Sequence, residues 1–225
     1  MSDHDHHRNH DHGHGHASDQ GVKAMFRYLR WAPQLWRSDI NDAVVDLVGP
    51  VEGETVLDIG AGLGAGAFRA ARAGASVVAV EPTPFLRRLL VIRRIFERER
   101  QRITVADGSA EHLPADSQTI DALWAVNTMH HWIDADAAAL EMKRVLVPGG
   151  RVALVDEDFE NPEHPEHERF GANADDHEHH GFTKVDVEQM GDRLRRVGLV
   201  DVVASERQLA GRPVIAITAR AAAGR

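Results

Sequence analysis

The chain lacks several kinds of residue and segment, and each absence excludes a class of protein. There is no cysteine among its 225 residues, which excludes disulfide bonds, thiolate metal sites and cysteine nucleophiles. No apolar run reaches transmembrane length, and the N-terminus is polar rather than signal-like. The formal net charge of −9 argues against a general binder of nucleic acid or of anionic membranes. We therefore expect a soluble cytoplasmic protein, monomeric or homodimeric, without a membrane or nucleic-acid partner.

A short apolar segment that runs into a cluster of glycines is the strongest signal in the sequence. Residues 55–59 have the composition of a strand buried on both faces, and Gly60, Gly62 and Gly64 follow directly. The alanine-rich stretch 65–73 then favours a helix. A strand, a glycine turn and a helix in this order present main-chain N–H groups at a helix N-terminus, with no Cβ in the way of a ligand.

An acidic residue stands at the end of the next strand-like run, 76–80. This residue, Glu81, follows the glycines by about 20 residues, where a βαβ unit places the ribose of a nucleoside. A carboxylate there can accept hydrogen bonds from both ribose hydroxyls. The sequence therefore predicts a nucleoside cofactor. The spacing Gly60-x-Gly62-x-x-Ala65 also satisfies the dinucleotide fingerprint, so this motif alone leaves NAD and FAD open.

Strands and helices alternate along the rest of the chain. The periodicity predicts further strands over 103–106, 120–126 and 151–155, with helices over 39–48, 84–98, 135–145 and 184–197. Two last strands, 199–205 and 214–219, are close enough in sequence to form a hairpin. Five β/α units followed by a helix and a hairpin predict an α/β fold that differs from two mononucleotide-binding halves.

Five segments between residues 55 and 155 resemble the class I S-adenosylmethionine (SAM)-dependent methyltransferases, specifically the small-molecule branch typified by the ubiquinone and menaquinone methyltransferases. They are VLDIGAGLG, VEPT, ADGSAEHLP, DALWAVNTMHHW and KRVLVPGG. The resemblance implies a Rossmann-like three-layer sandwich with a seven-stranded, mostly parallel sheet and a C-terminal antiparallel hairpin. It also implies one methyltransferase domain over 21–225, which transfers the methyl group of SAM to an oxygen, nitrogen or carbon of a small-molecule acceptor by in-line displacement.

The resemblance further implies which residues bind the cofactor. Asp58 and the main chain at the three glycines would hold the methionine end, and Glu81 would hold the ribose diol. Asp107 would accept a hydrogen bond from the adenine amine, and Asn127 would lie near the reactive sulfonium. The full set of implied cofactor-binding residues is Asp58, Gly60, Gly62, Gly64, Glu81, Pro82, Asp107, Gly108, Ser109, Ala110 and Asn127.

Two adjacent histidines, His130 and His131, follow the fourth predicted strand and are candidates for the catalytic base. If the acceptor is a hydroxyl or an acidic carbon, a base with a pKa near neutrality assists the transfer. Either imidazole meets that need, and we favour His131. The alternative is that one of them packs with Trp132 or shapes the acceptor pocket.

Histidines also gather in two other segments. Residues 1–20 carry seven of the 15 histidines and no apolar core residues, so we expect a disordered tail that binds Zn or Ni weakly or not at all. The acidic loop 156–181 contains His164, His167, His177, His179 and His180. We expect this loop to be a substrate lid, with a metal site and a plain surface loop as the alternatives.

Two other functions stay open on the sequence. An NAD-dependent oxidoreductase shares the glycine motif, but the closing hairpin and the Asp107 segment fit it poorly and no Tyr-x-x-x-Lys pair is present. A non-catalytic protein that binds SAM or metal through the histidine-rich tail and loop is the second alternative.

Overall fold

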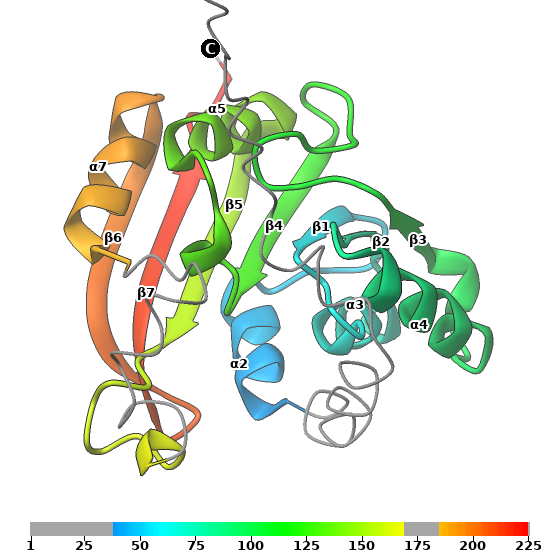
Figure 1. The fold of residues 1–225 in the computed structure, drawn as a ribbon. Coiled ribbons are helices and arrows are strands. Elements are labelled where there is room, and N and C mark those ends of the chain that lie inside the picture. Colours follow the sequence, from blue (N-terminus) through cyan, green and yellow to red (C-terminus); the bar gives the residue numbers. More distant parts are fainter. Residues whose placement is uncertain (1–37, 169–184, 225) are drawn as a thin grey trace, which may run out of the picture.

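The computed structural model describes residues 38–168 and 185–224. They form one seven-stranded sheet in the order β3-β2-β1-β4-β5-β7-β6. The strands β1 to β5 are parallel to one another, whereas β7 pairs antiparallel with both β5 and β6. The predicted Rossmann-like α/β fold with a closing hairpin is confirmed (Figure 1). The predicted tail over 1–20 and the segment 21–37 lie outside the described residues.

The strands fall close to their predicted positions. In chain order they are β1 (Thr55–Ile59), β2 (Ser76–Val80), β3 (Ile103–Ala106), β4 (Ile120–Val126), β5 (Leu146–Glu157), β6 (Leu199–Leu209) and β7 (Arg212–Ala221). The four residues Val56 to Ile59 of the central strand β1 are fully buried, because helices cover both faces of the sheet.

The helices divide between the two faces. The helices α2 (Asp39–Val48), α3 (Ala65–Arg72) and α4 (Pro84–Ile95) contribute buried side chains to one core cluster. The helices α5 (Ala135–Val145) and α7 (Val187–Arg196) contribute to the other. Two short 3-10 helices, η1 (Arg100–Arg102) and η2 (Met129–His131), complete the described elements. The result is a three-layer sandwich in which the sheet separates two apolar cores.

Helix ends depend on local hydrogen bonds that the sequence predicts only in part. Ser38 caps α2 as its residue type suggests, since its hydroxyl accepts a hydrogen bond from the N–H of Asn41. The predicted helix over 84–98 is three residues too long. It ends at Ile95 because the N–H groups of Phe96 and Glu97 turn to carbonyls three residues back.

Two strand boundaries differ from the predicted ones. The strand predicted over 151–155 is longer in the structure, because residues 146–150 are also part of β5. The extra residues are absorbed as a register shift against β4. The final hairpin is longer than expected. Its turn is Ala210–Gly211, both with positive φ (50° and 73°), which suits the right-handed twist of the two strands. Arg212 and Pro213, which lie between the two predicted strands, belong to β7.

The carboxyl ends of the parallel strands lie at one edge of the sheet, together with the segments that follow β4 and β5. Figure 1 shows the β4 and β5 arrows ending in the lower half of the view, with the yellow segment after β5 beside the turn between β6 and β7. The N–H of Asp158 donates to the carbonyl of Pro213, which joins these two regions. An open α/β sheet binds its ligand at this edge.

Candidate functional site

The glycine loop after β1 has the backbone conformation that only glycine adopts without strain. Gly60, Gly62 and Gly64 have φ values of 68°, 53° and 84°, in the left-handed region. A Cβ on Gly60 would overlap the side chain of Thr128, which follows β4. The loop therefore depends on glycine twice, for its φ angle and for its close approach to the neighbouring strand end.

We expect Gly60→Ala to destabilise the protein more than Gly211→Ala. Both positions have φ near 70° (68° and 73°), so each substitution costs roughly 1–2 kcal/mol of backbone strain. Only Gly60 adds an overlap, because nothing lies within 4 Å of a Cβ on Gly211, and overpacking costs about 1–3 kcal/mol more. Urea denaturation of both variants measures the difference, and equal losses would show that Thr128 moves aside freely.

Glu81 lies at the tip of β2 and is bonded to the glycine loop. Its Oε2 accepts a hydrogen bond from the N–H of Gly62, and its Oε1 accepts one from the N–H of Thr83, both at 2.8 Å. The residue is 3% exposed, and this burial raises the pKa of Glu81. The hydrogen bonds from the two N–H groups favour the charged form, but the effect of burial is larger. The structure thus joins two sequence-predicted site residues into one unit.

Asp58 lies at the end of β1 and is also buried, with 3% of its surface exposed. Burial raises the pKa of Asp58 to about 7, although the N–H of Ala67 and the Trp124 indole favour the charged form. Its Oδ2 and the Trp124 Nε1 both lie beside Gly66. Neither atom completes a hydrogen bond with any residue that the structure describes. The Trp124 indole therefore faces the Asp58 carboxylate without the geometry of a full hydrogen bond at Oδ2.

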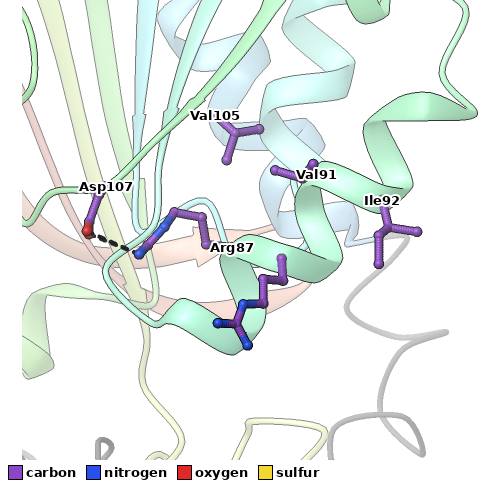
Figure 2. A pocket seen from close by; sticks show the side chains of 6 residues that line it. Arg87, Val91, Ile92, Val105 and Asp107 are labelled. Carbon is purple, nitrogen blue, oxygen red and sulfur yellow. Dashed lines mark hydrogen bonds and ion pairs between the residues drawn. The ribbon is translucent and has the colours of Figure 1, made fainter.

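Asp107, at the end of β3, is held by an arginine from α4. The two Asp107 oxygens accept from Arg87 at 2.9 and 3.1 Å (Figure 2). Arg87 also donates to the carbonyls of Glu81 and Pro82. The Asp107 side chain is 72% exposed and borders a shallow surface hollow between α4 and β3 (Figure 2). Arg87 therefore links the ends of β2 and β3.

The three residues after Asp107 form a tight loop. Ser109 and His112 exchange main-chain hydrogen bonds at 3.3 and 3.1 Å. A Cβ on Gly108 would lie 2.8 Å from Pro114 Cδ, and Ala110 is buried in the core. This packing fixes the main chain of the segment that the sequence assigns to adenine binding.

Asn127, after β4, is bonded to the end of β5. Its Nδ2 donates to Glu157 Oε1 and its Oδ1 accepts from the N–H of Glu157, both at 2.7 Å. These two bonds hold Asn127 at a positive φ of 53°. The other Glu157 oxygen accepts from Arg212 at 2.7 Å and contacts His164 Nε2 at 3.0 Å. The Asn127 amide group is thus oriented by Glu157, which the sequence did not identify.

The described histidines of the loop after β5 make structural contacts. His164 has a fully buried side chain, and its Nδ1 accepts from the N–H of Glu166 at 3.1 Å while its Nε2 faces Glu157. His167 Nδ1 contacts the carbonyl of Phe159. Within 38–168 and 185–224, no group of three or more His, Asp or Glu side chains could hold a metal ion. His177, His179 and His180, and the loop beyond residue 168, lie outside the described residues.

The two catalytic candidates occupy different environments. His130 is half-buried, and its Nδ1 lies 2.7 Å from the carboxylate of Asp156. His131 is exposed, with its ring centroid 4.0 Å from that of His130. Asp156 also accepts hydrogen bonds from the N–H groups of Thr128, Met129 and His130. Sequence reasoning missed Asp156, although an acid at the end of the predicted fifth strand was a usable signal.

The glycine loop, the acidic residues at the strand ends and the order of the strands are together typical of Rossmann-like proteins that bind a nucleoside cofactor. Residues 57–154 match the family of methyltransferase domains. This part of the chain is similar to the SAM-dependent methyltransferases, and a solved structure of such a protein shares the fold. No helix among the described residues is both long enough and apolar enough to span a membrane.

Individual relatives are similar to about half of the chain. An uncharacterised methyltransferase of Mycobacterium bovis is 39% identical over 112 residues, which are 49% of this chain and 43% of the relative. A demethylmenaquinone methyltransferase of Thermobifida fusca is 35% identical over 119 residues, 53% of this chain and 48% of the relative. The chain thus spans about half the length of these relatives.

A solved structure supports the fold. The phosphoethanolamine N-methyltransferase 2 of Haemonchus contortus, in complex with SAM, has a TM-score of 0.68 at 17% identity, over 81% of this chain and 52% of that chain. At this level of identity the likeness establishes the architecture.

Proposed function

We propose that this protein transfers the methyl group of SAM to a small-molecule acceptor. The observation that carries the proposal is the hydrogen bond from the N–H of Gly62 to the buried carboxylate of Glu81. This bond places a glycine loop and an acid side by side at the ends of β1 and β2. A ribose needs such an acid, and the methionine part of the cofactor needs such open main chain.

The other residues fit the same cofactor. The Asp58 oxygen that lacks a hydrogen-bond partner among the described residues suits the ammonium of the methionine moiety, since a buried carboxylate favours a cationic partner. Asp107 can accept from the adenine amine while it keeps Arg87, because a carboxylate has about four lone-pair sites. Pro82 and the 108–110 loop would border the adenine. Asn127, held by Glu157, would lie near the sulfonium.

SAM supplies the electrophilic methyl group, so the protein contributes chiefly by alignment and exclusion of water. Alignment of the acceptor with the methyl carbon and sulfur can lower the barrier by about 7–11 kcal/mol. The Glu81 and Asp58 carboxylates would fix the two ends of the cofactor, and the segment after β4 would face the acceptor.

The acceptor is proposed to be a small molecule on two grounds. One relative is named as a demethylmenaquinone methyltransferase, and the net charge of −9 disfavours RNA. Incubation of the protein with methyl-labelled SAM and metabolite extracts would reveal the acceptor as a labelled product of low molecular mass.

Titration calorimetry with SAM, S-adenosylhomocysteine and NAD tests the cofactor. We expect the two adenosyl compounds to bind with similar affinity and NAD to give no heat of binding. Binding of NAD in preference to SAM would refute the proposal and favour an oxidoreductase.

A further inference from the structure

The outward face of α4 carries an apolar stripe. Four of the ten large apolar side chains that are exposed among the described residues lie between positions 91 and 96. Helical spacing places them on the side of α4 opposite Leu90, the α4 side chain that is buried in the core. We call these four residues the α4 stripe: Val91, Ile92, Ile95 and Phe96.

The apolar surface continues from the α4 stripe to the edge of the sheet. Val91 and Ile92 line the shallow hollow between α4 and β3, together with Val105 (Figure 2), and β3 is the edge strand. At the other end of the stripe, Phe96 is 84% exposed. Apolar side chains that are gathered in this way gain free energy when another surface covers them, and such a patch marks an interaction site.

Arginines flank the α4 stripe without acidic partners. Residues 84–102 contain seven arginines and two glutamates, in a chain whose formal net charge is −9. Both glutamates are already paired, Glu97 with Arg72 and Glu99 with Arg102. Three other arginines are exposed and form no ion pair with any acid that the structure describes. We call them the flanking arginines: Arg88, Arg98 and Arg100. The net charge of the whole chain therefore conceals a local positive surface.

We propose that α4 docks this protein onto a lipid surface with anionic headgroups. The α4 stripe enters the boundary between headgroups and acyl chains, and the flanking arginines meet the lipid phosphates while their aliphatic stems lie along the apolar surface. An amphipathic helix binds in the plane of the interface, so no spanning helix is needed. The inference differs from our expectation of no membrane partner, which rested on the net charge of the whole chain. It does not depend on the proposed methyl transfer.

Other occupants match this face less well. A second copy in a two-fold contact would bring the same arginines against one another. The segment 21–37 of the same chain has four basic residues and no acid, so it is repelled as well. RNA matches the flanking arginines but leaves the α4 stripe uncovered. An acidic protein would be held by few directional hydrogen bonds, because the stripe has no side-chain donor or acceptor. A lipid surface supplies both anionic groups and an apolar layer.

Co-sedimentation of the full chain with vesicles tests the lipid requirement. We expect binding to vesicles made of equal parts of phosphatidylglycerol and phosphatidylcholine, and much weaker binding to phosphatidylcholine alone. Added salt should weaken the binding to the mixed vesicles. No SAM is present, so the result is independent of the proposed function. Equal binding to both kinds of vesicle, or binding to neither, would overturn the proposal.

Surface variants test the two parts of the docking face separately. Arg98→Glu should lower the partition coefficient for the mixed vesicles by roughly 5- to 30-fold, because it removes one favourable charge and adds a repulsive one. Ile95→Ser should lower it by roughly 3- to 10-fold, because less apolar surface enters the interface. Leu140→Ser in α5 is the control for Ile95→Ser, since the two side chains are 60% and 59% exposed. Arg207→Glu in β6 is the control for Arg98→Glu.

The two control variants should bind the mixed vesicles as the unmodified protein does. Losses in the controls equal to those in Arg98→Glu and Ile95→Ser would overturn the role of α4. All four substitutions are on the surface, so circular dichroism should be unchanged. Calorimetry should show that Ile95→Ser binds SAM as the unmodified protein does. Failure of the unmodified protein to bind SAM would refute the proposed function and leave the lipid proposal standing.

A photo-cross-linker at position 96 identifies what covers the α4 stripe. Phe96→benzoylphenylalanine in the full chain, irradiated with the mixed vesicles, should form cross-links to lipid that mass spectrometry detects. Cross-links to residues 21–37 or to a second copy, in place of lipid, would overturn the proposal and assign the face to that segment or to a dimer. Cross-links to an added RNA in place of lipid would overturn it in favour of a nucleic-acid site.

Discussion

Replacing Glu81 with glutamine should raise the dissociation constant for SAM by roughly 10²–10⁴-fold. Hydrogen bonds to a charged group contribute roughly 1.5–3 kcal/mol each, and the proposed site uses two of them for the ribose hydroxyls. Their loss corresponds to that change in affinity, since each 1.4 kcal/mol is about tenfold. Glutamine also turns an N–H donor toward either Gly62 or Thr83, whose own N–H groups now donate to the carboxylate.

The stability of the free protein distinguishes loss of the ribose contact from loss of the fold. Burial raises the pKa of Glu81, so its charged form is held at a cost that the neutral amide does not bear. We therefore expect Glu81→Gln to remain folded, as circular dichroism and urea denaturation would show. Glu54→Gln is the matched control, because Glu54 also accepts a main-chain N–H, from Val51, but at the amino end of β1. Its affinity for SAM should be unchanged. A Glu81→Gln variant that binds SAM as tightly as the unmodified protein would refute the ribose role.

The architecture was predictable because each strand and helix has a recognisable pattern within its own short segment of sequence. The central strands are short continuous apolar runs, whereas the helices have apolar residues every three or four positions. The type of each element can therefore be predicted from a short segment. Element ends were less predictable because they depend on partners from elsewhere in the chain. The start of β5 is an example: Leu146 pairs with Ile120, and nothing near 146–150 in the sequence reveals that pairing.

The site was predictable where a backbone requirement or a strand end specified it. The glycine loop and Glu81 were found because glycine at positive φ and an acid at a strand tip are each visible in sequence. The contact between His130 and Asp156 was not visible, because the two residues are 26 positions apart in the sequence. Asp156 and Glu157 act across the sheet on the segment after β4. That relation exists only once β4 and β5 are known to be adjacent.

Replacing Asp58 with asparagine should stabilise the free protein at pH 8. The pKa of Asp58 is raised from 3.8 to about 7 in the folded state, so the folded protein binds a proton that the unfolded chain has released at intermediate pH. Stability therefore falls as pH rises from about 4 to about 7 and is constant above. A shift of this size corresponds to as much as roughly 4 kcal/mol at pH 8. Asparagine removes this cost, so the gain should be largest at pH 8 and should vanish near pH 4. Urea denaturation across this range measures it.

Glu54 is a control for the sign of this effect, because its pKa is shifted in the opposite direction from that of Asp58. The pKa of Glu54 is lowered: burial opposes the shift, and the Arg151 guanidinium and the N–H of Val51 outweigh it. Its charge therefore adds stability above the ordinary pKa, and this contribution is lost as pH falls. Glu54→Gln should destabilise the protein at pH 8 and have little effect in acid. Asp58→Asn should do the reverse at pH 8. Equal behaviour of the two variants would contradict the raised pKa that burial gives Asp58.

The same carboxylate links SAM binding to proton release. If the cofactor ammonium pairs with Asp58, it favours the charged form, and a protonated Asp58 must lose its proton when SAM binds. The affinity for SAM should then rise with pH up to about 7, the pKa of Asp58 in the free protein. Calorimetry at pH 6 in two buffers with different ionisation enthalpies should give different heats, as proton release requires. In Asp58→Asn this buffer dependence should disappear along with much of the affinity. A heat of binding that is independent of buffer in the unmodified protein would show that Asp58 does not meet the ammonium, and would place its role in the packing beneath the glycine loop.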